Sequence, residues 1–158
     1  MEFDRAVQIL IDAEVELVIV DGVSGLLLGS SQLTFDIDFC YSRTTSNLRR
    51  LVAALAVFHP RPRGFPDGLP FIWDEATLRN STVLTLQTDI GDIDLLAEIA
   101  GLGSYDGVKA HSIVVEAFDR KIVTLDLPGL IQAKRAAGRE KDLAALPELE
   151  SLLEASEP

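Results

Sequence analysis

The sequence predicts an α+β fold in which a small mixed β-sheet is flanked by helices and followed by C-terminal helices. Apolar residues recur every three or four positions in some segments, as on one face of a helix, and every second position in others, as on one face of a strand. No internal repeat or low-complexity segment is visible. We expect a single domain over residues 1–158, with a core over about 1–125 and a helical segment over about 126–155.

A helix, a strand and a short second helix are predicted at the start of the chain. Apolar residues repeat at helical spacing over 3–11, which predicts an amphipathic helix. Residues 16–20 form an apolar run that ends at an Asp-Gly pair, which predicts a buried strand. A short helix is expected over 23–28, because Gly29 is a typical C-terminal stop.

The next segment combines a strand, a helix and a loop. Residues 35–41 alternate acidic and apolar side chains, which predicts a strand with one buried face. A Thr-Thr-Ser run at 44–46 can cap the helix that follows, which has a leucine-rich face. Residues 59–70 are rich in Pro and Gly and are expected to form a loop.

The second half of the chain predicts two strand pairs and then helices. Residues 82–88 and 93–96 are expected to form a hairpin around a turn at 89–92, and 101–107 is expected to be a loop. A second strand pair is predicted at 112–118 and 121–125. The chain turns helical from Asp126, with Pro128 near the start, and leucines from 143 to 152 lie along a final helix.

Composition and charge limit the function classes. The formal net charge of -11 argues against a protein that coats nucleic acid non-specifically. Cys40 is the only cysteine, which excludes an internal disulfide and is typical of a cytoplasmic chain. No signal peptide and no apolar run of membrane-spanning length is visible, so no membrane partner is expected.

Two acids on the predicted strand over 35–41 are the first candidates for chemistry. Side chains alternate along a strand, so Asp36 and Asp38 point the same way, roughly 6.5 to 7 Å apart. At an effective dielectric of 20 they would repel by roughly 2.5 kcal/mol, which a divalent cation would relieve. Mg²⁺ is often held by one or two carboxylates together with substrate phosphates. The alternative is that both acids simply face solvent.

A third carboxylate is needed for phosphoryl-type transfer with two metal ions, and Asp94 is the best candidate. It lies between Ile93 and Leu95 and so repeats the apolar-acid-apolar pattern. The alternative for Asp94 is a solvated strand position. Asp92 lies two residues earlier and is interpreted as an acid of the hairpin turn.

Small and basic residues supply candidates for binding phosphate. Gly29 and Ser30 can present backbone N–H groups and a hydroxyl to a triphosphate, although an ordinary helix stop is the alternative. A basic segment near the C-terminus could neutralise the triphosphate or an RNA acceptor end; its members are Lys134, Arg135, Arg139 and Lys141.

The basic segment also has an ordinary interpretation, as a solvated face paired with neighbouring acids. Residues 134 and 141 share a helical face only if the helix is unbroken at Gly138. Arg61 and Arg63 of the Pro-rich loop could contact a phosphate backbone, but they are interpreted as solubilising residues.

Three motifs together resemble the minimal nucleotidyltransferases of the polymerase β-like superfamily, and more narrowly the AbiE-type toxin nucleotidyltransferases of bacterial toxin–antitoxin systems. They are Gly29-Ser30 with Thr34-Phe35-Asp36-Ile37-Asp38, Ile93-Asp94-Leu95-Leu96, and the Lys-Arg-Ala-Ala-Gly-Arg-Glu-Lys-Asp run over 134–142. They occur in the family's order and extend over nearly the whole chain.

The resemblance implies a fold, an activity and roles for particular residues. The fold would be the nucleotidyltransferase fold, with Asp36 and Asp38 as ligands of Mg²⁺ or Mn²⁺ and Asp94 as third ligand or general base. Ser30 would contact the phosphates and Lys134 would neutralise them. The activity would be transfer of a nucleoside monophosphate from an NTP, such as ATP, to a hydroxyl. Some toxins of this kind modify the tRNA 3′ end and are paired with an antitoxin protein.

Two functions therefore follow from the sequence. The first is a metal-dependent nucleotidyltransferase in which an acceptor hydroxyl attacks the α-phosphate of an NTP. The second is a non-catalytic module of the same fold that binds a nucleotide or a partner such as an antitoxin. Three acids in the pattern of a metal site favour the first, because a retired site has no physical need to keep like charges together.

Overall fold

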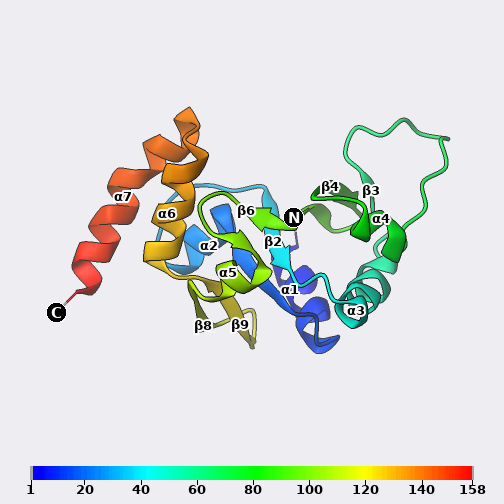
Figure 1. Cartoon of the computed structure of the whole chain (residues 1–158), viewed down its shortest axis with the longest axis horizontal. Coiled ribbons are helices and arrows are strands. Elements are labelled where there is room, and N and C mark those ends of the chain that lie inside the picture. Colours follow the sequence, from blue (N-terminus) through cyan, green and yellow to red (C-terminus); the bar gives the residue numbers. More distant parts are fainter. Residues whose placement is uncertain (1, 158) are drawn as a thin grey trace.

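The structure is a computed structural model that describes residues 2–157, and it confirms the α+β fold (Figure 1). Its helices are α1 (Phe3–Asp12), α2 (Asp21–Leu27), α3 (Thr45–Ala56), α4 (Glu75–Arg79), α5 (Tyr105–Lys109), α6 (Leu127–Ala137) and α7 (Glu140–Ser156). Its strands are β1 (Leu17–Val20), β2 (Asp36–Tyr41), β3 (Arg61–Pro62), β4 (Val83–Thr88), β5 (Gly91–Leu96), β6 (Glu98–Ile99), β7 (Gly103–Ser104), β8 (Ser112–Ala117) and β9 (Arg120–Leu125).

Seven strands form one mixed sheet in the order β3-β4-β5-β2-β1-β9-β8. The pairs β2–β5 and β1–β9 are parallel, and the other neighbours are antiparallel. The predicted hairpins β4–β5 and β8–β9 are both present. Strands β2 and β5 are neighbours although about 50 residues separate them in the sequence, and this long-range pairing positions the acidic residues.

Alternate residues of the central strands feed two separate cores. Ile19 and Phe39 are buried in the cluster that includes α1 and α3, whereas Val20 and Cys40 are buried in the cluster with α6 and α7. Because side chains alternate along a strand, Asp38 must lie on the same face as Cys40. The acidic residues of β2 therefore face the layer that carries the C-terminal helices.

The basic segment is divided between two helices. Gly138 adopts the left-handed backbone conformation, with φ of 65°, and ends α6. Its amide donates to the Lys134 carbonyl at 3.0 Å, and α7 begins two residues later. Lys134 and Lys141 therefore lie on different helices, which excludes the single unbroken helical face.

Three predicted loops and turns contain regular structure. Arg61 and Pro62 of the Pro-rich segment pair with β4 as an edge strand, which suits proline because an edge residue needs no ladder hydrogen bond on its outer side. Asp92 belongs to β5 rather than to the turn before it. The expected loop at 101–107 contains β7 and the start of α5. None of the helices within residues 2–157 combines the length and apolarity needed to cross a bilayer.

Asn47 is a fully buried polar residue that joins the start of α3 to the residue before β1 and to the residue after β2. Its amide donates to the carbonyls of Glu16 at 3.0 Å and Ser42 at 2.7 Å, and its oxygen accepts from the Glu16 amide at 2.7 Å. Replacing Asn47 with Ala would leave these buried groups unpaired. We expect the free energy of unfolding to fall by about 2–4 kcal/mol in urea titrations.

The matched control is Asn80→Ala, because Asn80 is exposed and its side chain makes no hydrogen bond to residues 2–157. That change should alter stability by no more than about 0.5 kcal/mol. Equal unfolding midpoints for the two variants would show that Asn47 does not secure α3 in this way.

Candidate active site

Three carboxylates from two parallel strands converge on one face of the sheet. In the β2–β5 register, Asp36 lies opposite Asp92 and Asp38 lies opposite Asp94. Asp36, Asp38 and Asp94 each contribute a carboxylate oxygen that lies within 4.8 Å of the other two. Oxygen ligands at this spacing can hold a divalent cation.

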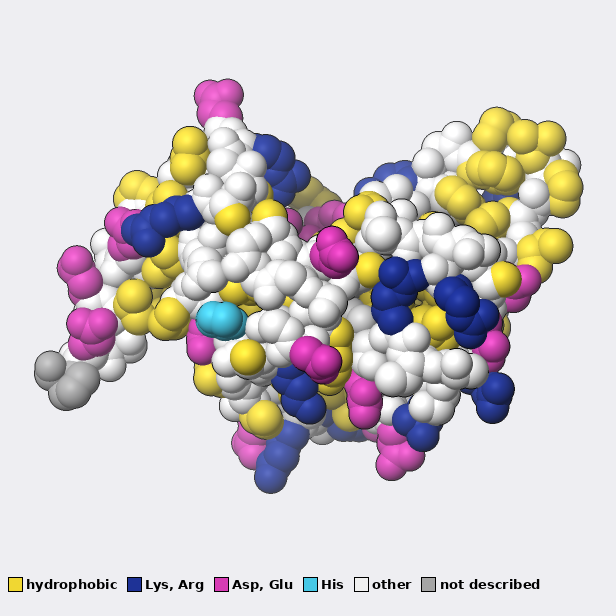
Figure 2. All heavy atoms as spheres, viewed as in Figure 1, with side chains coloured by type: hydrophobic (Ala, Val, Ile, Leu, Met, Phe, Trp, Pro, Cys, Tyr) yellow, Lys and Arg dark blue, Asp and Glu magenta, His cyan; other side chains and the backbone are white. Residues whose placement is uncertain are grey.

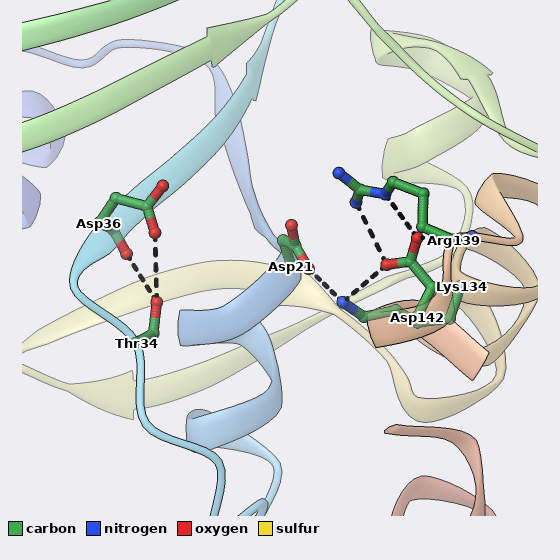
Figure 3. Close-up of polar contacts among 6 residues, drawn as sticks. All are labelled: Asp21, Thr34, Asp36, Lys134, Arg139 and Asp142. Atoms are coloured by element: carbon green, nitrogen blue, oxygen red, sulfur yellow. Dashed lines mark hydrogen bonds and ion pairs between the residues drawn. The ribbon is translucent and has the colours of Figure 1, made fainter. Parts of the chain in front are cut away.

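Local contacts orient Asp36 at the start of β2. The Thr34 hydroxyl donates to the Asp36 backbone carbonyl at 3.1 Å and to its carboxylate at 3.3 Å (Figure 3). Thr34 in turn packs against Gly22, where a Cβ atom would come within 2.7 Å of the threonine hydroxyl. A residue larger than glycine at this position would therefore displace the group that holds Asp36.

Asp38 is the most deeply buried of the three acids. Its residue is only 6% exposed, and its Oδ1 atom has no hydrogen-bond partner among residues 2–157. Burial, and then the negative charges of Asp21, Asp36 and Asp94, raise the pKa of Asp38 to about 9. Burial also raises the pKa of Asp94, although an ion pair with Arg63 opposes this. A buried, unpartnered carboxylate oxygen among like charges fits a site that receives a cation.

Arg63 was interpreted as a solubilising loop residue, and the structure shows that this was wrong. Its Nη2 atom donates to Asp94 Oδ1 at 2.7 Å, and its Nε atom lies 3.2 Å from Asp92 Oδ2. The pairing of β3 with β4 brings Arg63 beside the acids, because the Arg63 amide continues this pairing by donating to the Thr85 carbonyl. A local sequence pattern does not reveal such a contact.

Asp21 is a fourth acid beside the site, and in the sequence it is visible only as part of the Asp-Gly pair that ends a strand. It begins α2 with φ of 57°, a left-handed conformation uncommon for residues other than glycine. Figure 3 shows it between Asp36 and the basic side chains of the C-terminal helices. Burial would raise the pKa of Asp21, but its contact with Lys134 outweighs burial and holds the pKa below its ordinary value.

Lys134 and Arg139 approach the acids from the C-terminal helices, as Figure 3 shows. Lys134 donates to Asp21 and also lies 3.4 Å from Asp142. Arg139 Nε donates to Asp142 at 2.6 Å, and the Asp142 side chain is only 1% exposed. Burial disfavours the Asp142 carboxylate, but Arg139 and then Lys134 outweigh it, so that its pKa is lowered. The two cations are thus held by acids of the chain itself.

The remaining predicted residues are divided between the site and its surroundings. Ser30 and Lys141 line the same cleft as the acids, whereas Gly29 and Arg135 do not. Gly29 packs beside Leu152 of α7, with φ of 109°. Arg135 pairs with Glu150 on the surface, where its side chain is 60% exposed.

The Ser30 hydroxyl is engaged by a carboxylate of α7. It donates to Glu148 Oε1 at 2.6 Å, and the neighbouring Ser31 hydroxyl donates to Glu148 Oε2 at 2.5 Å. Glu148 could not be predicted as a contact of Ser30, because nothing in its local sequence distinguishes it from the other acids of the helix.

The acids and the cleft-lining cations lie in an open cleft of about 700 Å³, a size that accommodates a nucleotide. Figure 2 shows the surface hollowed between the C-terminal helices and the β3–α4 segment, with basic side chains on both sides of the hollow. Phe35, which is 81% exposed, contributes an aromatic ring beside Asp36. A smaller recess of about 170 Å³ adjoins the cleft at Lys134 and Arg139 and has mainly apolar walls.

The fold is that of a nucleotidyltransferase. The chain is similar to a solved structure from Thermotoga maritima described as a "putative nucleotidyltransferase", with a TM-score of 0.58 and 17% sequence identity. The match covers 95% of this chain and 93% of the other. No protein-family model and no curated protein matches the sequence. The likeness shows the fold, and function has to be argued from the site.

Proposed function

We propose that this protein transfers a nucleoside monophosphate from an NTP to an acceptor hydroxyl. The acceptor oxygen forms a bond to the α-phosphorus, the bond from that phosphorus to the β-phosphate oxygen breaks, and pyrophosphate leaves. The observation that carries the proposal is the convergence of Asp36, Asp38 and Asp94 within 4.8 Å on the floor of a nucleotide-sized cleft. Like charges brought together and partly buried are costly without a cation, and acids arranged in this way are typical of phosphoryl-type transfer with bound metal ions.

The three acids would bind metal and activate the acceptor. Asp36 and Asp38 would hold Mg²⁺ or Mn²⁺, and Asp94 would act as the third ligand or as the base that orients the acceptor hydroxyl. The bound metal would polarise the α-phosphate oxygens and neutralise developing charge. Thr34 positions Asp36 by its hydrogen bonds, and the Arg63 ion pair positions Asp94.

The proposed substrate lies along the cleft between the acids and the C-terminal helices. Lys134, Arg139 and Lys141 line the cleft and would supply positive charge for a triphosphate. Phe35 offers an exposed ring on which a base of the nucleotide or of the acceptor can stack.

The motif resemblance to AbiE-type toxins supports a more specific proposal. The acceptor would be an RNA, with the tRNA 3′ end ranked first, and the protein would act in the cytoplasm as a toxin controlled by an antitoxin protein. The basic side chains on both sides of the hollow in Figure 2 suit a phosphate backbone. These side chains place positive charge on both sides of the hollow, although the whole chain has a formal net charge of -11.

One observation favours the second function, a non-catalytic module that binds a nucleotide or a partner. Acids of the same chain already engage three candidate phosphate-binding residues: Asp21 and Asp142 engage Lys134, Asp142 engages Arg139, and Glu148 engages Ser30. A site of this kind could recognise a ligand without turnover. The two functions differ in whether label is transferred.

The experiment that tests the proposal is incubation with each α-labelled NTP, Mg²⁺ and total tRNA. We expect label in the RNA for the wild-type protein and for Asp4→Asn, an exposed acid of α1 that serves as the control. Label should be lost in Asp36→Ala and Asp94→Ala. NTP binding without transfer to any acceptor would support the module instead, and equal transfer by all four proteins would refute the site.

A further inference from the structure

Glu148 accepts hydrogen bonds from a set of donors at the edge of the cleft, where Ser30 lines it. Both of its carboxylate oxygens accept from the turn that follows α2. The hydroxyls of Ser30 and Ser31 donate at 2.6 and 2.5 Å, and the Ser31 amide lies 3.2 Å from one oxygen and 3.3 Å from the other. The contact joins residues that are 117 or 118 positions apart in the sequence.

The donors form a cradle for an anion. The Ser30 hydroxyl accepts from the Gln32 amide at 3.1 Å, which directs its own proton towards Glu148. Two hydroxyls and one backbone amide then converge on a single negatively charged group, an arrangement that suits phosphate oxygens as well as a carboxylate.

The cradle adjoins the cleft that holds the acids, through Ser30. Ser30 lines the cleft together with Asp36 and Asp38, and α7 contributes Lys141 and Leu149 to its lining. Glu148 precedes Leu149 on that helix, so its carboxylate reaches from the cleft wall to the turn. The Ser30 hydroxyl, which lines the cleft, is therefore occupied by the carboxylate of Glu148.

We propose that Glu148 is an internal competitor for the phosphate chain of the nucleotide. In the ligand-free protein its carboxylate takes the donors of Ser30 and Ser31, and terminal phosphates of an NTP displace it. The inference rests on the proposed function for the identity of the ligand. It assigns α7 a role that neither the fold nor the three-acid site requires, namely to set how tightly polyphosphates bind.

The charge of Glu148 determines whether its removal should strengthen or weaken polyphosphate binding. Glu148 adds a negative charge to a region that already contains Asp21, Asp36 and Asp38 and that must receive a polyanion. Removing it frees three donors and also lowers the repulsion. We expect Glu148→Ala to bind Mg²⁺–tripolyphosphate, and a non-hydrolysable Mg²⁺–NTP analogue, about tenfold more tightly than wild type by isothermal titration calorimetry.

The matched control is Glu150→Ala, which removes the same charge from the same helix but from an ion pair with Arg135 on the surface. Its affinity should stay within about twofold of wild type. The same gain in both variants would overturn the proposal, because it would reflect overall charge rather than the cradle. Unchanged or weaker binding by Glu148→Ala would also overturn it.

Two further variants separate competition from a role of Glu148 in holding α7. Glu148→Gln removes the charge but keeps an acceptor, so its gain in affinity should lie between those of wild type and Glu148→Ala. Adding Ser31→Ala to Glu148→Ala should cancel most of the gain, because the phosphates then lose a donor. A double variant that retains the whole gain would contradict the cradle. Far-ultraviolet circular dichroism establishes that each variant is folded before titration.

The outcomes distinguish this inference from the proposed function. Tighter tripolyphosphate binding by Glu148→Ala without label transfer by wild type would support the cradle and refute the transferase. Label transfer by wild type with no gain in Glu148→Ala would do the reverse. Absence of polyphosphate binding by every protein would refute the cradle.

Discussion

Replacing Asp38 with Asn is expected to lower the rate of nucleotide transfer by about a thousandfold or more. Asp38 is the central acid, because its neighbours in the cluster include Asp21, Asp36 and Asp94. An amide has almost the same shape as the carboxylate but cannot supply the negative charge that holds a divalent cation. The measurement is the initial rate of label transfer at saturating Mg²⁺ and NTP.

The matched control is Asp92→Asn, which makes the same chemical change two residues from Asp94 on β5. Asp92 contacts Arg63 but lies outside the group of three acids. We expect its rate to fall by less than about tenfold. If Asp38→Asn retained more than a tenth of the wild-type rate, Asp38 could not be an essential metal ligand.

The same substitution is expected to stabilise the metal-free protein, and increasingly so as the pH rises. The pKa of Asp38 is raised to about 9 in the folded state, chiefly by burial, whereas in the unfolded chain it returns to about 3.9. Between these values the folded state binds the extra proton. Stability contributed by Asp38 is therefore complete below about pH 4 and is lost as the pH rises towards 9.

Asp38→Asn removes this dependence, because an amide does not titrate. In buffers containing a chelator, its free energy of unfolding relative to wild type should increase by about 4 kcal/mol between pH 5 and pH 8, because each pH unit between the two pKa values is worth about 1.4 kcal/mol. Urea titrations at several pH values measure the difference. Adding Mn²⁺ should stabilise wild type and leave Asp38→Asn unchanged. If the difference in free energy of unfolding between the two proteins stayed constant across this pH range, the pKa of Asp38 could not be raised in the folded state.

The sequence predicts those parts of the fold that local patterns encode. The alternation over Asp36–Tyr41 and the apolar spacing of Phe3–Asp12 are each visible within one element, and both elements are present. The order of strands in the sheet cannot be predicted in this way. It depends on which strands pair with β2, and these partners lie far from β2 in the sequence and are selected by burial of its two faces. Short elements such as Arg61–Pro62 owe their structure to a partner strand and have little signal of their own.

The candidate site shows the same division. Asp94 could be chosen as a candidate because it repeats the apolar-acid-apolar pattern of Asp36 and Asp38. The parallel register of β2 and β5 then places Asp94 opposite Asp38. Arg63 and Glu148 reach the site through tertiary contacts that no spacing along the chain predicts. Asp21 could have been suspected, because an acid that directly follows a buried strand lies at the edge of the sheet where ligands often bind.

The most direct test of a shared cation site is the crystal structure of the protein with Mn²⁺ and a non-hydrolysable NTP analogue, with anomalous scattering used to locate the metal. We expect an anomalous peak about 2.1 Å from carboxylate oxygens of Asp36 and Asp38, with Asp94 directed towards the same cluster. A fully occupied analogue with manganese bound elsewhere, and with Asp94 still engaged only by Arg63, would contradict the account.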